Sequence, residues 1–252
     1  KTPPENLPAY DPGCYLCPGN PRAAGRVNPA YNGVYVFDND FPALLKPEEI
    51  QPATPVQTTS SPLLMMLPEH GLCRVACFSP RHDLTLPELS QAEVEQVVQA
   101  WSAQTQELGA LAYIRYVQVF ENKGALMGCS NPHPHSQIWA VSYLPDEPAR
   151  ELQTQRDYLK EHHRCLLCDY LSTERQAKSE RLVCENEHFS ALVPFWATWP
   201  FEILLISHRH AGSLPDLTPA EVSSLADILR QVTTRYDNLF EISFPYSMGF
   251  HQ

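Results

Sequence analysis

Glycine is scarce in this sequence: only 10 of the 252 residues are glycine, whereas 24 are proline. Neither G-x-G-x-x-G nor G-x-x-x-x-G-K-[ST] occurs, so the two common glycine-rich loops that hold phosphates are excluded. The many prolines indicate long connections in extended conformation. Any phosphate group that the chain binds is therefore expected to be held by local side chains and turns.

Long apolar runs and an excess of positive charge are missing as well. No stretch of about 18 or more apolar residues occurs, and no charged-then-apolar leader opens the sequence, so we expect no membrane partner and a cytoplasmic location. The net charge of -11 disfavours nucleic acid as a partner, because phosphate neutralisation needs clustered Lys and Arg. The hydrophobic content of 43% suffices for one large core or two modest ones.

The eight cysteines include two pairs at the same close spacing, Cys14-x-x-Cys17 and Cys165-x-x-Cys168. This spacing suits metal binding or redox chemistry in a reducing compartment better than a set of disulfides. For the first pair, metal ligation is the favoured interpretation, although two buried thiols are the simpler alternative.

An internal repeat organises the chain. Both cysteine pairs are followed by a matching strand pattern, then by a Ser-x-Arg-His segment that ends at His82 or His210, and then by a helix start with a capping box. The repeat predicts two tandem halves, residues 1–145 and 146–252, of α+β class, each an antiparallel sheet with a long helix packed on it. The two halves are expected to join into one continuous sheet or to form a close pair. The second half ends before a counterpart of 133–143, so we expect a missing C-terminal piece.

Most of the chemistry is concentrated in residues 121–140, ENKGALMGCSNPHPHSQIWA. Two prolines fix φ and bias their neighbours to extended geometry, which places His133, His135 and Gln137 on one face at the start of a strand. A neutral imidazole can attack the α-phosphorus of a nucleotide sugar and form a phosphoramidate, which a second phosphate can displace. The segment therefore favours nucleotidyl transfer in two steps.

The stretch GCSNPHPHSQIWA resembles the active-site signature of galactose-1-phosphate uridylyltransferases in the histidine-triad superfamily. The resemblance extends to CYLCPGN, YVFDNDFPAL, VPFWATWPFE and YDNLFEISFPYSMGFHQ, and so covers nearly the whole chain. It implies two histidine-triad-like halves and a homodimer. It also implies a ping-pong reaction, in which UDP-glucose uridylylates the enzyme and releases glucose 1-phosphate, and galactose 1-phosphate then accepts the uridylyl group to give UDP-galactose.

The resemblance also implies roles for single residues. His135 would be the nucleophile, and Gln137 would hydrogen-bond the phosphoryl oxygens of the intermediate. The Asn39-Asp40 pair, otherwise an ordinary turn signal, would contact the uridine ribose. The phosphates would be contacted by Asn122, Gly128, Cys129 and Ser130. Glutamine cannot shuttle a proton at neutral pH, so Gln137 independently favours transfer over hydrolysis. At Ser136 many members carry glycine, and we expect this side chain to point away from the ligand.

Metal sites follow from the same resemblance and from the repeat. The resemblance places the ligands of a structural zinc ion at Cys14, Cys17, His82 and His133. It also implies a second metal, iron or zinc, held by Glu151, His251 and two histidines beyond the present end. By the repeat, the second cysteine pair and His210 mirror the first site and could bind their own zinc. Family members also have further terminal segments that are missing here, which bears on sugar selectivity.

Two rival functions stay open at the level of the sequence. One is a related nucleotidyltransferase, for example an adenylyl-transferring phosphorylase of the same superfamily. The other is a zinc-stabilised binding protein that has lost catalysis. Competition between nucleotides for covalent labelling would distinguish an adenylyl-transferring enzyme from a uridylyl-transferring one. Binding of a nucleotide sugar without a covalent adduct would identify a binding protein.

Overall fold

The computed structural model describes residues 7–49, 63–64, 69–177 and 180–252. Residues 46–70 contain Pro-Glu-Glu and Thr-Thr-Ser-Ser-Pro, which predict a polar loop, and most of this segment lies outside the described range. The first half of the chain and the last strand form a five-stranded antiparallel sheet of order β1-β2-β4-β3-β8. Its strands are β1 (Tyr35–Asp38), β2 (Gly71–Cys77), β3 (Tyr116–Lys123), β4 (His135–Val141) and β8 (Tyr246–Phe250).

A smaller antiparallel sheet, of order β5-β6-β7, belongs to the second half. It consists of β5 (Leu182–Glu185), β6 (Phe189–Leu192) and β7 (Leu204–Ser207). The helices are α1 (Gln91–Gly109), α2 (Asp146–His162), α3 (Leu166–Gln176) and α4 (Pro219–Phe240). Short 3-10 turns are η1 (Ala23–Gly25), η2 (Pro47–Glu49), η3 (Leu86–Glu88), η4 (Ala125–Met127) and η5 (Leu214–Asp216).

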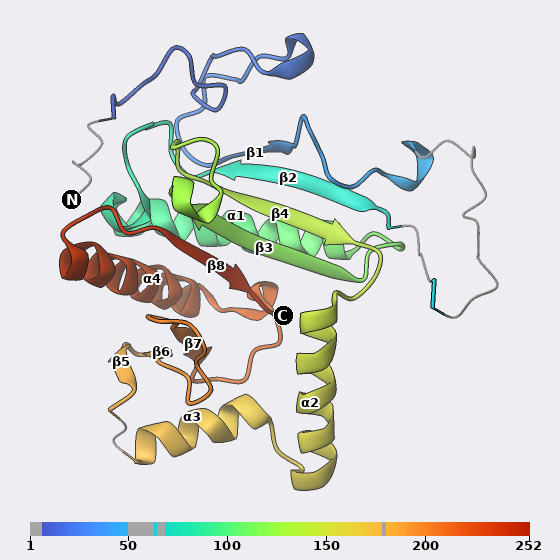
Figure 1. The fold of residues 1–252 in the computed structure, drawn as a ribbon, viewed down its shortest axis with the longest axis vertical. Helices are drawn as coiled ribbons and strands as arrows, with labels where there is room; N and C mark the ends of the chain where they lie inside the picture. The colour runs from blue at the N-terminus through green and yellow to red at the C-terminus, as the bar shows by residue number, and fades with distance from the viewer. Residues whose placement is uncertain (1–6, 50–62, 65–68, 178–179) are drawn as a thin grey trace.

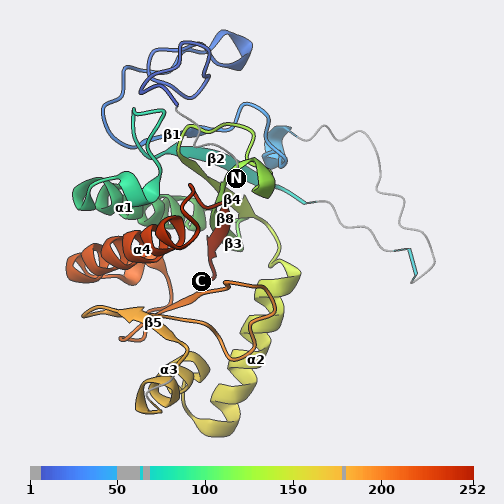
Figure 2. The same ribbon diagram turned by 60° about the vertical axis from the view of Figure 1, so that its left-hand side comes forward.

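The two long helices form a layer between the two sheets. Helix α1 packs on β3 and β4, α4 packs on β5 and β6, and the helices pack on each other (Figures 1 and 2). Apolar residues at helical spacing make this possible, because they give each helix a buried stripe. In α1 the stripe is Val94, Val97, Val98 and Trp101. The predicted α+β class with antiparallel sheets and packed helices is confirmed.

Both long helices begin with the predicted capping boxes. The Ser90 hydroxyl accepts the amide of Glu93 at 3.3 Å, and the Glu93 carboxylate accepts the amide of Ser90 at 2.8 Å. Thr218 and Glu221 make the same pair of bonds at 3.3 and 2.8 Å. Each box satisfies backbone donors at a helix start, so it fixes where the helix begins after the histidine segment.

Strand β8 is the main departure from a simple pair of halves. The sequence left open whether the halves share one sheet, and the structure shows two separate sheets with β8 of the second half added to the edge of the first. Its residues Tyr246 and Gly249 pair with Lys123 and Phe120 of β3. The Tyr246 hydroxyl also donates to the carboxyl group of Glu121 at 2.9 Å. This contact anchors β8 through side chains as well as through the backbone ladder.

The buried carboxyl group of Glu121 predicts a pH-dependent stability. Its side chain is 4% exposed, and burial raises the pKa of Glu121 from 4.5 to about 7. The folded state then holds a proton that the unfolded state releases, so stability is present below the unfolded pKa and is lost as pH rises towards the folded pKa. The free energy of unfolding should therefore fall by up to about 3 kcal/mol between about pH 4.5 and 7.

Chemical denaturation of wild type and Glu121→Gln across this pH range checks the expectation. The variant should lose this part of the pH dependence. Glu161→Gln, which changes an exposed glutamate of α2, should keep it. Equal slopes in wild type and Glu121→Gln would contradict the assignment.

Candidate active site and metal centres

Strand β4 turns one row of side chains towards the helices and the other towards the opposite face. Ser136, Ile138 and Ala140 are fully buried, whereas His135 and Gln137 are half-buried on the other face. The Ser136 hydroxyl accepts a hydrogen bond from the indole N–H of Trp101 in α1 at 2.8 Å. Ser136 thus points away from His135, as expected, and a small polar side chain is satisfied there.

The position of His135 fixes the tautomer of its ring. Its Nδ1 lies 2.8 Å from the carbonyl oxygen of His133. A carbonyl can only accept, so Nδ1 carries the hydrogen and Nε2 keeps a free electron pair. Burial also lowers the pKa of His135, which favours the neutral ring. A neutral imidazole with an unprotonated Nε2 is chemically able to act as a nucleophile.

Gln137, two residues further along the same face, is oriented by its neighbour Trp139. The indole N–H of Trp139 donates to Oε1 of Gln137 at 3.2 Å. Because an indole nitrogen can only donate, the amide oxygen must face it and the amide nitrogen is left to donate elsewhere. The sequence reasoning did not anticipate this role of Trp139, which the alternation of the strand could have suggested.

Asn122 lies on the neighbouring strand at the level of His135. The strand register pairs Phe120 with Gln137, and continuing the antiparallel pairing by two residues brings Asn122 opposite His135. The side-chain oxygen of Asn122 accepts a hydrogen bond from the Ser247 hydroxyl of β8 at 2.6 Å. Its amide nitrogen is thus directed to donate, as a phosphate contact requires.

The turn that precedes the histidines differs in detail from the expectation. Gly124 and Gly128 have positive φ values of 89° and 80°, which glycine tolerates and which let the chain reverse. The amide of Gly128 donates to Ala125 at 3.0 Å, and the amide of Cys129 donates to Gly124 at 3.3 Å. The backbone N–H groups of Gly128 and Cys129, which could have bound a phosphate, are therefore engaged within the turn. The exposed Ser130 is left as a candidate donor.

The Asn39-Asp40 turn lines a separate pocket of about 310 Å³ at the end of β1. Asp40 forms an ion pair with Arg26 at 3.0 Å and lies 3.7 Å from Arg22. The Arg22 guanidinium stacks on Phe37 with 3.8 Å to the ring centroid. The sequence reasoning missed both arginines, although they lie in the segment directly after the first cysteine pair.

This pocket is well separated from His135 along the sheet. His135 is level with Cys77 and Tyr35 across two strands, and Asn39 follows Tyr35 by four residues. With strand spacings near 4.8 Å and a rise near 3.3 Å per residue, the two main-chain positions are roughly 15 Å apart. Only an extended ligand would contact both.

Four nitrogen and sulfur ligands meet beside the start of β4. The donor atoms of this first cluster all lie within 4.8 Å of one another, and all four residues are buried: Cys14, Cys17, His82 and His133. The Cys17 sulfur lies 3.6 and 3.5 Å from Nδ1 of the two imidazoles. The cluster joins the N-terminal loop, the loop after β2 and the segment before β4.

The surroundings of the first cluster suit a metal ion. Nε2 of His133 lies 3.0 Å from the carbonyl oxygen of Ser79, so Nε2 carries the hydrogen and Nδ1 faces the cysteines as a ligand. The amide of His133 donates to the side chain of Asn131 at 2.9 Å. Two thiols and two imidazoles at this spacing match the donor set of a closed tetrahedral zinc site, whereas Mg²⁺ and Ca²⁺ prefer oxygen.

The pair Glu151 and His251 is also brought together. The Glu151 carboxylate lies 2.7 Å from Nδ1 of His251, which joins α2 to the segment after β8. Both side chains are about half exposed. Among the described residues, no third His, Cys, Asp or Glu donor joins them to form a cluster.

The fold and site together are those of a nucleotidyltransferase of the histidine-triad type. The profile of the galactose-1-phosphate uridyl transferase N-terminal domain matches residues 1–145, and the profile of the C-terminal domain matches residues 151–252. The chain belongs to the galactose-1-phosphate uridylyltransferase family. The predicted family and the predicted enzyme class, a uridylyltransferase, are thereby confirmed.

Individual relatives agree with this membership. The galactose-1-phosphate uridylyltransferase of Haemophilus influenzae is 54% identical over 98% of this chain and 68% of its own length. The enzyme of Rattus norvegicus is 50% identical over 98% of this chain and 63% of its own length. The chain thus spans about two thirds of the length of these relatives.

Solved structures show the same architecture. A uridylyltransferase structure matches with a TM-score of 0.83 and 29% identity over 98% of this chain and 75% of the other. An ADP-glucose phosphorylase from Arabidopsis thaliana, with bound ADP-glucose, matches with a TM-score of 0.75 and 25% identity over 98% and 74%. Separately, no helix among the described residues of this chain has the length and apolar character to span a membrane.

The first cluster predicts a metal whose loss a single ligand substitution should cause. Cys17→Ser should retain one zinc ion fewer per chain after dialysis, because three ligands hold the ion more weakly than four. Competition with a chelator, followed by elemental analysis, measures this. Cys73→Ala is the matched control, since Cys73 is equally buried but lies outside the cluster. Unchanged zinc in Cys17→Ser would refute the site.

Proposed function

We propose that this chain transfers a uridylyl group from UDP-glucose to galactose 1-phosphate through a covalent intermediate on His135. The observation that carries the proposal is the neutral ring of His135, whose Nδ1–H is held by the His133 carbonyl while Nε2 is free. Family membership supports the substrates, since the curated relatives carry the name galactose-1-phosphate uridylyltransferase.

The chemistry divides into two displacements. In the first, Nε2 of His135 attacks the α-phosphorus of UDP-glucose, a P–N bond forms, and the P–O bond breaks with glucose 1-phosphate leaving with the electron pair. In the second, a phosphate oxygen of galactose 1-phosphate attacks the same phosphorus, and the P–N bond breaks. The electron pair of that bond returns to Nε2. The hydrogen stays on Nδ1 throughout, hydrogen-bonded to the His133 carbonyl oxygen, so the imidazole needs no other base.

Neighbouring donors would stabilise charge on the phosphoryl oxygens. The amide nitrogens of Gln137 and Asn122 are both directed to donate, because their oxygens are occupied by Trp139 and Ser247. Neither amide shuttles protons at neutral pH, which protects the intermediate from water. Ser130 would contribute a further donor. The Asn39-Asp40 turn, roughly 15 Å away, would bind the ribose at the other end of the nucleotide.

Metals, assembly and location complete the proposal. Zinc at the first cluster would fix the segment that carries His133 and thus the carbonyl that orients His135. Glu151 and His251 would contribute to a second site for iron or zinc. We place the enzyme in the cytoplasm as a homodimer that binds UDP-glucose, UDP-galactose and hexose 1-phosphates, and neither nucleic acid nor membrane.

Intact-mass spectrometry tests the covalent step. Wild type incubated with UDP-glucose should gain the mass of a uridylyl group and lose it on addition of galactose 1-phosphate. His135→Ala should show no gain, whereas His70→Ala, which changes a histidine outside the site, should behave as wild type. Labelling by ADP-glucose in preference to UDP-glucose would favour an adenylyl-transferring enzyme. Binding of UDP-glucose by metal-loaded wild type without any adduct would indicate a binding protein.

Because Trp139 orients Gln137, substitutions at the two positions should lower kcat by different amounts. Gln137→Ala removes a donor to the developing charge, so kcat should fall by about 10²-fold. Trp139→Phe keeps an aromatic side chain but removes the indole N–H that holds the oxygen of Gln137. The kcat should therefore fall by a smaller factor, about tenfold, with little change in KM. Steady-state kinetics of the two single variants and the double variant measure this. Additive losses would contradict a shared mechanism, because the effect of Trp139 runs through Gln137.

A further inference from the structure

The second cysteine pair and the histidine that follows β7 form another cluster of metal-binding side chains. Cys165 is the residue before the first turn of α3, Cys168 lies in that turn, and His210 comes three residues after the end of β7. Their donor atoms all lie within 4.8 Å of one another. The Cys168 sulfur is 3.6 Å from Nδ1 of His210.

The geometry of this second cluster repeats that of the first. Cys17 and His82, the equivalents of Cys168 and His210 in the repeat, show the same 3.6 Å distance between sulfur and Nδ1. In both halves the sequence places a C-x-x-C pair far from its histidine, and the fold brings them together. This agreement between the two clusters argues against a chance approach of the three side chains.

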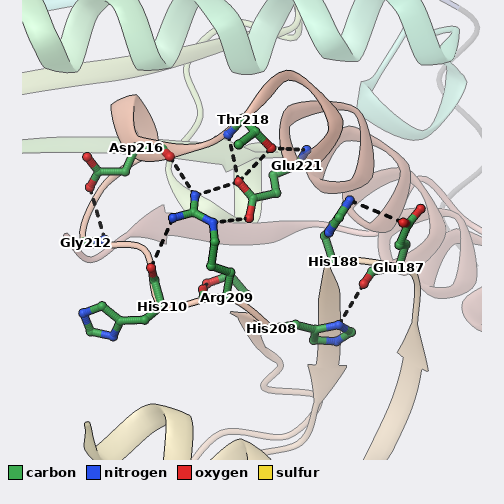
Figure 3. Close-up of polar contacts among 10 residues, drawn as sticks. Glu187, His188, His208, Arg209, His210, Gly212, Asp216, Thr218 and Glu221 are labelled. Carbon is green, nitrogen blue, oxygen red and sulfur yellow. Dashed lines mark hydrogen bonds and ion pairs between the residues drawn. The ribbon is translucent and has the colours of Figure 1, made fainter.

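The backbone of His210 is held by the neighbouring ion pair between Arg209 and Glu221. The Arg209 guanidinium donates twice to the Glu221 carboxylate, at 2.7 Å each, and once to the carbonyl oxygen of Asp216 at 2.7 Å. It also donates to the carbonyl oxygen of His210 at 3.3 Å. Figure 3 shows the imidazole of His210 projecting away from this network. The backbone is thus fixed while the ring is left available.

The second cluster is more exposed than the first. The described residues supply three donors in place of four, with Cys165 and Cys168 half-buried and His210 exposed. Two thiols and one imidazole are ligands that zinc binds in proteins. Mg²⁺ prefers oxygen ligands, and none of these three side chains supplies one.

A metal at this position would strengthen the attachment of α3 to the small sheet. Helix α3 rests on the small sheet through a small apolar cluster. Its buried residues are Leu171, Leu192 and Ile206, and Leu167, Tyr170, Leu182 and Leu204 pack against them partly buried. Helix α2, which precedes it, has no buried residue. A bond from the first turn of α3 to the segment after β7 would fix the helix pair to the sheet.

We propose that Cys165, Cys168 and His210 contribute three ligands to a zinc ion of their own. Binding converts the two thiols to thiolates, releases two protons to solvent and changes no oxidation state. The site is separate from the uridylyl-transfer chemistry proposed above and does not depend on it.

Zinc content of the full chain is the primary test. Protein loaded with zinc under reducing conditions and then dialysed should contain one ion fewer per chain in Cys168→Ser than in wild type. His210→Gln, a change at an exposed position that should not disturb folding, should give the same loss. Cys184→Ser, at a half-buried free cysteine outside the cluster, should match wild type. His135→Ala should also match wild type, which separates this site from the proposed catalysis.

Cobalt substitution supplies an independent readout. The thiolate-to-cobalt absorption of wild type should fall by about half in Cys168→Ser if two sites with two thiolates each are loaded. Equal metal content in wild type, Cys168→Ser and His210→Gln would overturn the proposal. A Cys165–Cys168 disulfide that persists under the reducing, zinc-loaded conditions, seen by peptide mapping, would overturn it as well.

Discussion

One hydrogen bond, from Nδ1 of His135 to the carbonyl oxygen of His133, links the structural and the chemical parts of this molecule. His133 contributes its ring to the buried cysteine-histidine cluster and its backbone carbonyl to the ring of His135. The two functions belong to one residue, so any shift of the cluster changes the orientation of the neighbouring imidazole. Pro134, between them, restricts the backbone and makes the coupling stiff. The orientation of the His135 ring therefore depends on the packing of a loop more than a hundred residues away in sequence.

The repeat shows how one structural unit can serve two purposes. In each half, a C-x-x-C pair meets the histidine of a Ser-x-Arg-His segment, and a capping box then starts the long helix. The first half adds His133 and encloses its four donors, whereas the described part of the second half leaves three donors near the surface. The arginine of the segment also differs in its partner, since Arg81 pairs with the nearby Asp83 and Arg209 reaches Glu221 of the capping box.

The sequence predicted the features that depend on local chemistry and missed those that depend on distant contacts. Helix starts at Ser90 and Thr218 follow from hydrogen bonds that span three residues, so they can be recognised from spacing alone. The addition of β8 to β3, by contrast, joins segments more than a hundred residues apart and leaves no local mark. The arginines around Asp40 were missed because their ion pairs join segments 14 and 18 residues apart, which no short-range pattern marks. In the turn before His133, residue types indicated the reversal correctly, but the direction of each N–H depended on φ values that only the structure supplies.

Strand β8 has a consequence for how the two halves depend on each other. It covers the edge of β3, and its Ser247 orients the side chain of Asn122 at the level of His135. The first half alone would expose a row of unpaired backbone donors and acceptors, a surface that invites pairing with other chains. The duplicated units are therefore no longer independent: the second half completes the edge of the sheet that carries His135, the proposed nucleophile.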